Sequence, residues 1–137
     1  MADVMISRAA VDCIHRAAAA AHPQEACGLL LGRGAHVIHA TIAANVASSP
    51  ATRFEIDPAH LLAAHRAARG GRPAIIGYWH SHPTGMAWPS STDAAMADAD
   101  GRLWAILGGG TLSLFRAVPD GDVLGRFVAV PWLPGVD

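Results

Sequence analysis

Two histidines, a serine and an aspartate lie close together in the segment GYWHSHPTGMAWPSSTD, which spans residues 77–93. His80 and His82 are two residues apart at the end of an apolar run, so in an extended chain both imidazoles point to the same side. Asp93 follows His82 by eleven residues, after a loop with two prolines and a glycine that can fold back toward the strand. Two histidines and one carboxylate are the protein ligands of an open catalytic zinc site, where water takes the fourth position. The spacing is therefore compatible with a metal centre.

The same residues allow other interpretations. Ser90 and Asp93 have the Ser-x-x-Asp spacing of a capping box, which places them at the start of a helix. A His-x-His pair also arises by chance in a chain with eight histidines. Non-haem iron oxygenases use the same two-histidine, one-carboxylate set, although they usually need a larger all-β barrel. From these residues alone, a capped loop, a zinc site and an iron site all remain open.

The composition describes an ordinary globular protein. The chain has 137 residues, 52% of them hydrophobic and 15% charged, with a formal net charge of −1, which predicts one domain over residues 1–137. Because no basic block stands out, we expect no nucleic-acid or membrane partner. Cys13 and Cys27 form no CxxC motif, so we interpret both as small buried residues. Without a long apolar run or a secretion signal, we expect a cytoplasmic location.

Turn residues and apolar runs predict the elements that position these side chains. We expect a first helix capped by Ser7, a second from Pro58 to about Arg69, and a short third helix in SSTDAAMADAD. Strands are expected in ACGLLLG, HVIHATIAAN, RFEI, AIIGYW, RLWAIL, TLSLFRAV and VLGRFVAV. The mixture of hairpins and strand–helix–strand units predicts an α/β fold. We expect a single-domain α/β/α sandwich around a mixed, largely antiparallel sheet of six or seven strands.

The full motif is more specific than its parts. His-Ser-His-Pro, then seven residues between His82 and Ser90, then Ser-x-x-Asp resembles the signature of the JAMM (JAB/MPN) zinc metalloprotease family. The proline and glycine spacing of the loop resembles the bacterial branch. The family also has an upstream glutamate, and HPQEACGLLLG supplies Glu25, followed by the Cys-Gly-hydrophobic-Gly run typical of bacterial members. RFEIDP resembles the family's segment before its second helix, so the resemblance covers nearly the whole chain.

The resemblance implies a JAB/MPN domain with cytidine-deaminase-like layering and a Zn²⁺ ion as cofactor. In this family pattern, His80, His82 and Asp93 hold the zinc. Glu25 is the general acid/base, and Ser90 donates a hydrogen bond to the tetrahedral oxyanion. The role of Ser90 at the oxyanion and its role as a helix cap do not exclude each other, because the backbone can cap the helix while the hydroxyl points at zinc.

Four neighbouring residues have weaker assignments. Ser81 alternates with the histidines, so we expect it to point away from the metal and to have a structural role. Cys27 is two residues beyond Glu25 and could share its face near the site, but the resemblance implies no ligand role for it. Met86 and Trp88 lie on the loop, where they either contact a substrate tail or pack the loop onto the body.

The resemblance implies hydrolysis of a peptide or isopeptide bond at the C-terminus of a ubiquitin-like or sulfur-carrier protein. That protein is then the partner, and its extended tail could add to a sheet edge. A non-catalytic scaffold of the same fold is the alternative. Such scaffolds generally lose the ligands, whereas this sequence keeps all three and the glutamate.

Overall fold

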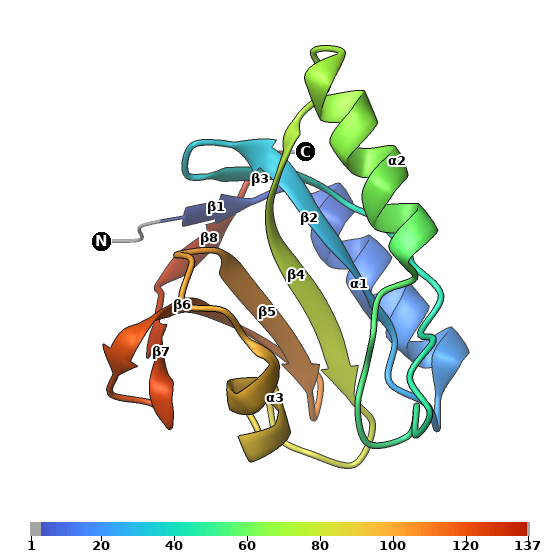
Figure 1. The fold of residues 1–137 in the computed structure, drawn as a ribbon, viewed down its shortest axis with the longest axis vertical. Coiled ribbons are helices and arrows are strands. Elements are labelled where there is room, and N and C mark those ends of the chain that lie inside the picture. The colour runs from blue at the N-terminus through green and yellow to red at the C-terminus, as the bar shows by residue number, and fades with distance from the viewer. Residues whose placement is uncertain (1–3, 137) are drawn as a thin grey trace.

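The computed structural model describes residues 4–136, which form one curved eight-stranded sheet with three helices packed against it (Figure 1). The strands lie in the order β7-β6-β5-β4-β2-β3-β1-β8. Along the chain the elements are β1 (Val4–Ile6), α1 (Arg8–Ala21), β2 (Cys27–Arg33), β3 (His36–Ala40), α2 (Pro58–Arg69), β4 (Ala74–His82), α3 (Ser91–Met96), β5 (Leu103–Gly108), β6 (Thr111–Gly121), β7 (Gly125–Ala129) and β8 (Trp132–Pro134).

The sheet is mixed, and its centre is made by β2, β4 and β5. Strand β4 pairs antiparallel with β2 and parallel with β5. The β2/β3, β5/β6 and β6/β7 pairs are antiparallel, whereas β1 runs parallel to both β3 and β8. Strand β4 is thus buried in the middle of the sheet, as its continuous apolar run predicted.

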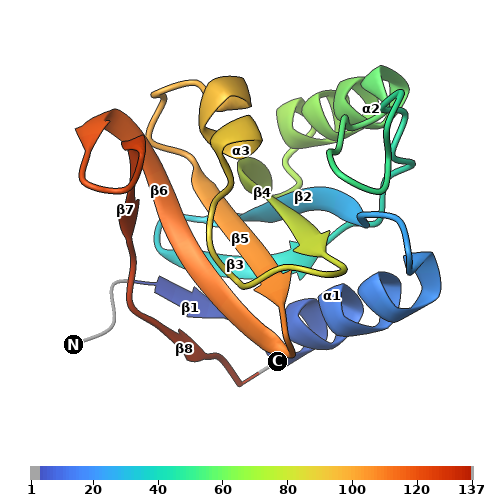
Figure 2. The same ribbon diagram turned by 90° about the horizontal axis from the view of Figure 1, so that it is seen from below.

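The helices cover both faces of this sheet, as Figure 2 shows. Helix α1 packs on one face, where its residues Ala10, Ile14 and Ala17 join a core cluster that includes Trp79. Helices α2 and α3 lie over the opposite face, where their apolar residues pack against a second cluster that contains Phe54, Trp104, Phe115 and Phe127. The predicted α/β fold with a mixed sheet between helical layers is therefore confirmed.

The helix caps follow the sequence signals. Ser7 Oγ accepts a hydrogen bond from the Ala10 amide at 3.1 Å, and its hydroxyl donates to the Ile38 carbonyl at 2.6 Å. Asp57 caps α2 by accepting from the Ala59 amide at 3.1 Å, with proline at the first helical position. Within residues 4–136, no helix has both the length and the apolar character needed to cross a membrane.

Four predictions about the elements were wrong in detail. The strand expected in HVIHATIAAN ends at Ala40. The sheet has eight strands rather than six or seven, because β1 and β8 are only three residues long and show no periodic pattern. RFEI is not a strand: only Ile56 makes a bridge, and the Glu55 amide donates to the Asn45 side chain at 3.1 Å instead of to a neighbouring strand. The third helix ends at Met96, and Ala97 already has extended backbone angles.

Gly28 sets the distance between β2 and the segment that follows β3. A Cβ atom at this position would lie 1.8 Å from the Thr41 carbonyl oxygen and 2.4 Å from Nε1 of Trp79. The indole donates a hydrogen bond to that same carbonyl at 2.7 Å. The missing side chain of Gly28 therefore lets the buried Trp79 of β4 reach across β2, which fixes β4 in the sheet.

Gly28→Ala should lower the free energy of unfolding by about 3 kcal/mol or more, at the upper end of overpacking costs, because the added methyl meets backbone and indole atoms. Urea unfolding followed by circular dichroism measures this change. Gly70→Ala is the matched control, because the nearest atom to its added Cβ is 3.4 Å away. We expect the control to change stability by no more than about 0.5 kcal/mol. Equal stabilities of the two variants would contradict the role given to Gly28.

Candidate metal centre

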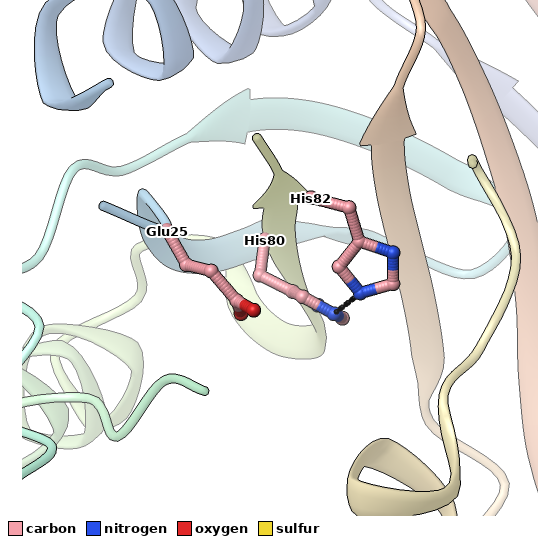
Figure 3. A group of neighbouring side chains, drawn as sticks. All are labelled: Glu25, His80 and His82. Atoms are coloured by element: carbon pink, nitrogen blue, oxygen red, sulfur yellow. Dashed lines mark hydrogen bonds between the residues drawn. The ribbon is translucent and has the colours of Figure 1, made fainter. Parts of the chain in front are cut away.

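Strand β4 presents two imidazoles on the sheet face that α2 and α3 cover. His80 pairs with Cys27 of β2 and with Ile106 of β5, so it lies in the middle of the sheet. His80 is fully buried. Nε2 of His80 and Nε2 of His82 are 3.1 Å apart, as the two-residue spacing predicted (Figure 3). The strand thus brings two ring nitrogens to one point.

Asp93 reaches the same point from the first turn of α3. Its Oδ1 lies 3.1 Å from Nε2 of His80, and its Oδ2 lies 3.2 Å from Nε2 of His82. Oδ2 also accepts a hydrogen bond from the Ser90 amide at 2.9 Å, which is half of a capping box. The capping box and the approach to the histidines therefore occur together.

Ser90 completes the capping box in a different way from the one expected. Its hydroxyl oxygen, rather than its backbone alone, caps the helix by accepting from the Asp93 amide at 3.1 Å. A hydroxyl that accepts through its oxygen still has its own hydrogen to donate. Ser90 is exposed and lines an open pocket together with Glu25 and His82. Its O–H is therefore free to donate to a group bound in that pocket.

The donor atoms of this cluster fit a metal ion. His80 Nε2, His82 Nε2 and the Asp93 carboxylate lie 3.1–3.2 Å from one another. The ligand atoms of a tetrahedral zinc, with bonds of about 2.0–2.1 Å, are about 3.3 Å apart. Nitrogen and carboxylate oxygen are also donors that zinc prefers. The three residues can thus hold a zinc ion with little rearrangement.

Proton counting leads to the same conclusion. Nδ1 of His82 lies 2.9 Å from the Met86 carbonyl oxygen, which can only accept, so Nδ1 carries a hydrogen. In a neutral His82 ring, Nε2 then presents a lone pair to Oδ2 of Asp93, 3.2 Å away, whereas Nε2–H of a neutral His80 can donate to Oδ1. Lone pairs at these distances repel one another unless a proton or a cation lies between them. A metal ion removes this conflict.

The two imidazoles are held by different means. The His82 ring is fixed by its hydrogen bond to Met86, whereas Nδ1 of His80 has no hydrogen-bond partner among residues 4–136. His80 is instead held by aromatic rings: Phe54 stacks on it with centroids 4.4 Å apart, and Trp104 meets it edge-on at 5.7 Å. Packing therefore orients the side of the His80 ring on which Nδ1 makes no hydrogen bond.

Glu25 lies just before β2 and points toward the imidazoles (Figure 3). Glu25, His80 and His82 each have a donor atom within 4.8 Å of the others, a looser group than the one with Asp93. The side chain is nearly buried, and its Oε1 has no hydrogen-bond partner in the described chain. Burial raises the pKa of Glu25 to about 7, opposed by His82 and reinforced by the negative charge of Asp93. A carboxyl of this kind exchanges its proton near neutral pH.

The pKa values of the three residues around this point shift in different directions. Burial would raise the pKa of Asp93, but hydrogen bonds from both histidines and the Ser90 amide hold it far below its usual range. Burial lowers the pKa of His80, and Asp93 only partly offsets this effect. Burial also acts to lower the pKa of His82, but hydrogen bonds with Asp93 and Met86 outweigh it, so the net shift is upward. The centre thus has an ionised carboxylate and a neutral His80.

The weaker assignments can also be placed. Ser81 points away from the histidines, and its Oγ accepts from the Ala26 amide at 2.9 Å. Cys27 is fully buried on the site's face of the sheet, and burial raises the pKa of its thiol to about 12, so it is no nucleophile. Met86 is 79% exposed. Trp88 is 51% exposed and meets Phe115 edge-on with ring centroids 5.3 Å apart, so the tryptophan packs against the body in part.

Sequence reasoning missed Asn45 and the role of Phe54. The Asn45 amide nitrogen donates to the Glu25 carbonyl at 3.0 Å and to the Arg53 carbonyl at 3.1 Å, and its oxygen accepts from the Glu55 amide at 3.1 Å. Asn45 therefore ties the segment that carries Phe54 to the backbone of Glu25. The available signal was weak: one amide side chain at the end of the run TIAAN.

Comparisons with known proteins agree with this arrangement. Over 86 residues, the chain is 33% identical to the desampylase of Haloferax volcanii, and the alignment covers 61% of this chain and 62% of that relative. The chain thus spans less than two thirds of the desampylase.

Solved structures share the fold. A protein of Desulfitobacterium hafniense with a known solution structure has a TM-score of 0.84 at 24% identity, and the match covers 98% of this chain and 94% of that one. A structure described as JAMM, a metalloprotease-like zinc site in the proteasome and signalosome, has a TM-score of 0.57 at 19% identity, with 95% and 97% covered.

The family is shown by a longer match. Residues 7–118, which include Glu25 and the whole His-Ser-His to Asp93 motif, match the family described as prokaryotic homologs of the JAB domain. The resemblance expected from the motif is therefore confirmed. This chain belongs to the prokaryotic JAB-domain family.

Proposed function

We propose that this chain is a zinc-dependent hydrolase that cleaves a peptide or isopeptide bond at the C-terminus of a ubiquitin-like or sulfur-carrier protein. The observation that carries the proposal is the convergence of two imidazole nitrogens and a carboxylate at 3.1–3.2 Å beside a buried Glu25, whose Oε1 has no hydrogen-bond partner within residues 4–136. The similarity to a desampylase supports a ubiquitin-like modifier as the substrate class.

In this proposal His80, His82 and Asp93 hold the metal. Zinc bound by such ligands supplies a Lewis acid and an activated water for attack on a carbonyl. Glu25 would take the proton that the attacking water gives up, at Oε1, and pass it to the departing amine, which its pKa of about 7 allows near neutral pH. The Ser90 hydroxyl donates a hydrogen bond to the oxygen that becomes negative during the attack.

An open pocket beside these residues suits an extended polypeptide tail. It is lined by Glu25, Ala51, Thr52, His82, Pro83, Thr84, Gly85 and Ser90. Apart from the glutamate and the histidine, its side chains are small and uncharged, so they leave room for a polypeptide backbone and add no charge beside it. We propose that Met86 and Trp88, which lie on the loop between β4 and α3, contact the substrate.

Protein purified without added metal should contain about one zinc per chain, because the three donors already lie at ligand spacing. His82→Ala should lose this zinc, since it removes one donor. The matched control is His65→Ala, which changes an exposed histidine on α2 and should retain the metal. Mass spectrometry of elemental content measures the stoichiometry. Stoichiometric iron without zinc would refute the zinc assignment.

Glu25→Gln should reduce hydrolysis of a carrier-protein fusion by about 10²–10⁴-fold, the usual contribution of a general acid/base. Zinc content should not change, because Glu25 is outside the tight group of three donors. Intact-mass analysis of carrier proteins with C-terminal extensions measures the cleavage. Glu55→Gln, which changes an exposed glutamate, is the control and should cleave at the wild-type rate. Undiminished hydrolysis by Glu25→Gln would remove Glu25 from the reaction.

Glu25 should also make the metal-free protein less stable as the pH rises. Its pKa is about 7 in the folded chain, against 4.5 ordinarily, so between these values the folded state keeps a proton that the unfolded state has lost. The stability linked to this proton is complete below pH 4.5 and is lost as the pH rises through about 7. We expect the free energy of unfolding of the wild type to fall relative to that of Glu25→Gln across this window.

Urea unfolding of both proteins in the presence of a chelator, at several pH values, measures the difference. A difference that stays constant with pH would show that the folded state does not raise the pKa of Glu25. A difference that grows in favour of the wild type would contradict the sign of the shift.

A further inference from the structure

The loop between β4 and α3 supplies the group that orients His82. The Met86 carbonyl oxygen accepts a hydrogen bond from Nδ1 of His82 at 2.9 Å and a second from the Trp88 amide at 2.8 Å. The Met86 side chain is 79% exposed, so its backbone rather than its side chain makes these contacts. The position of this one peptide group thus decides which way the His82 ring faces.

Gly108 lies directly against that peptide group. It is the last residue of β5 and the β-sheet partner of His82 across the β4/β5 pair. A Cβ atom on Gly108 would lie 2.5 Å from the Met86 carbonyl carbon, 2.7 Å from the Ala87 amide nitrogen and 2.8 Å from the Met86 oxygen. Any side chain at this position would therefore displace the peptide that His82 needs.

We propose that Gly108 is a positioning residue of the metal centre, which acts by leaving room for the Met86 carbonyl to bind Nδ1 of His82. A hydrogen bond at Nδ1 leaves the lone pair of the neutral ring on Nε2, the atom that faces His80 and Asp93. The inference rests on the metal-binding part of the proposed function, and it does not depend on which substrate is cleaved.

His82 depends on this contact more than His80 does. His80 is fully buried between Phe54 and Trp104, which hold its ring although Nδ1 makes no hydrogen bond within residues 4–136. The His82 side chain is 11% exposed and lines the open pocket, so it is enclosed on fewer sides. Loss of such an outer hydrogen bond to a histidine ligand typically costs about 10–100-fold in metal affinity.

Gly108→Ala should therefore bind zinc about 10–100-fold more weakly than the wild type while keeping the fold. Competition with a chromophoric chelator measures the affinity, and circular dichroism checks the fold. Gly70→Ala is the matched control: it makes the same change where the nearest atom is 3.4 Å from the added Cβ, and it should bind zinc like the wild type. A folded Gly108→Ala with wild-type affinity would overturn the inference and leave the proposed function intact.

A second measurement does not require the variant to fold. In the zinc-loaded wild type, ¹H–¹⁵N correlation spectra of the imidazoles should show a protonated, slowly exchanging Nδ1 on His82 and a metal-bound Nε2. A His82 that is protonated on Nε2, or that binds zinc through Nδ1, would overturn the inference. A wild-type protein that binds no zinc would instead overturn the proposed function, and the inference with it.

Discussion

The buried carboxylate of Asp93 is the group on which the geometry of the site depends. Its side chain is only 4% exposed, and burial of an ionised carboxylate is costly unless hydrogen-bond donors surround it. The Ser90 amide at the start of α3 and the two imidazoles of β4 lie at hydrogen-bond distance. The same group thus begins a helix and binds that helix to the sheet, so the loop after β4 must return to the strand it left.

The pKa values of the two carboxyl groups at the site, Glu25 and Asp93, are shifted in opposite directions. Asp93 has several donors within reach, which keep it ionised, whereas Oε1 of Glu25 has no partner in the described part of the chain and burial raises the pKa of Glu25 to about 7. Paired groups whose environments push their pKa values apart are the usual mark of divided acid and base roles. Phe54 contributes by excluding water from the face of His80 on which it stacks.

Local sequence signals predicted the parts of this molecule that depend on near neighbours. The two-residue spacing of His80 and His82, the caps at Ser7 and Asp57, and the hairpin of β2 and β3 all rest on contacts between residues close in sequence. Asn45 and Gly108 could not be identified in this way. Asn45 binds Glu25 across twenty positions, and Gly108 matters because the β4/β5 register places it beneath the Met86 peptide. Only the assembled sheet brings such residues together.

The two interpretations of Ser90 and Asp93, helix cap and metal site, are compatible because they use different atoms and lone pairs. The Ser90 oxygen and the Ser90 amide serve the cap, while the hydroxyl hydrogen and the imidazole-facing oxygens of Asp93 remain available. The cap therefore orders the carboxylate before any ion arrives. Two features of the centre remain unresolved by the cap: a neutral His82 directs the lone pair of Nε2 at Oδ2 of Asp93, and Oε1 of Glu25 has no hydrogen-bond partner among residues 4–136. In the proposed function a cation between the donors would relieve the repulsion at His82, so the fold already holds its donors in the arrangement that the proposal requires.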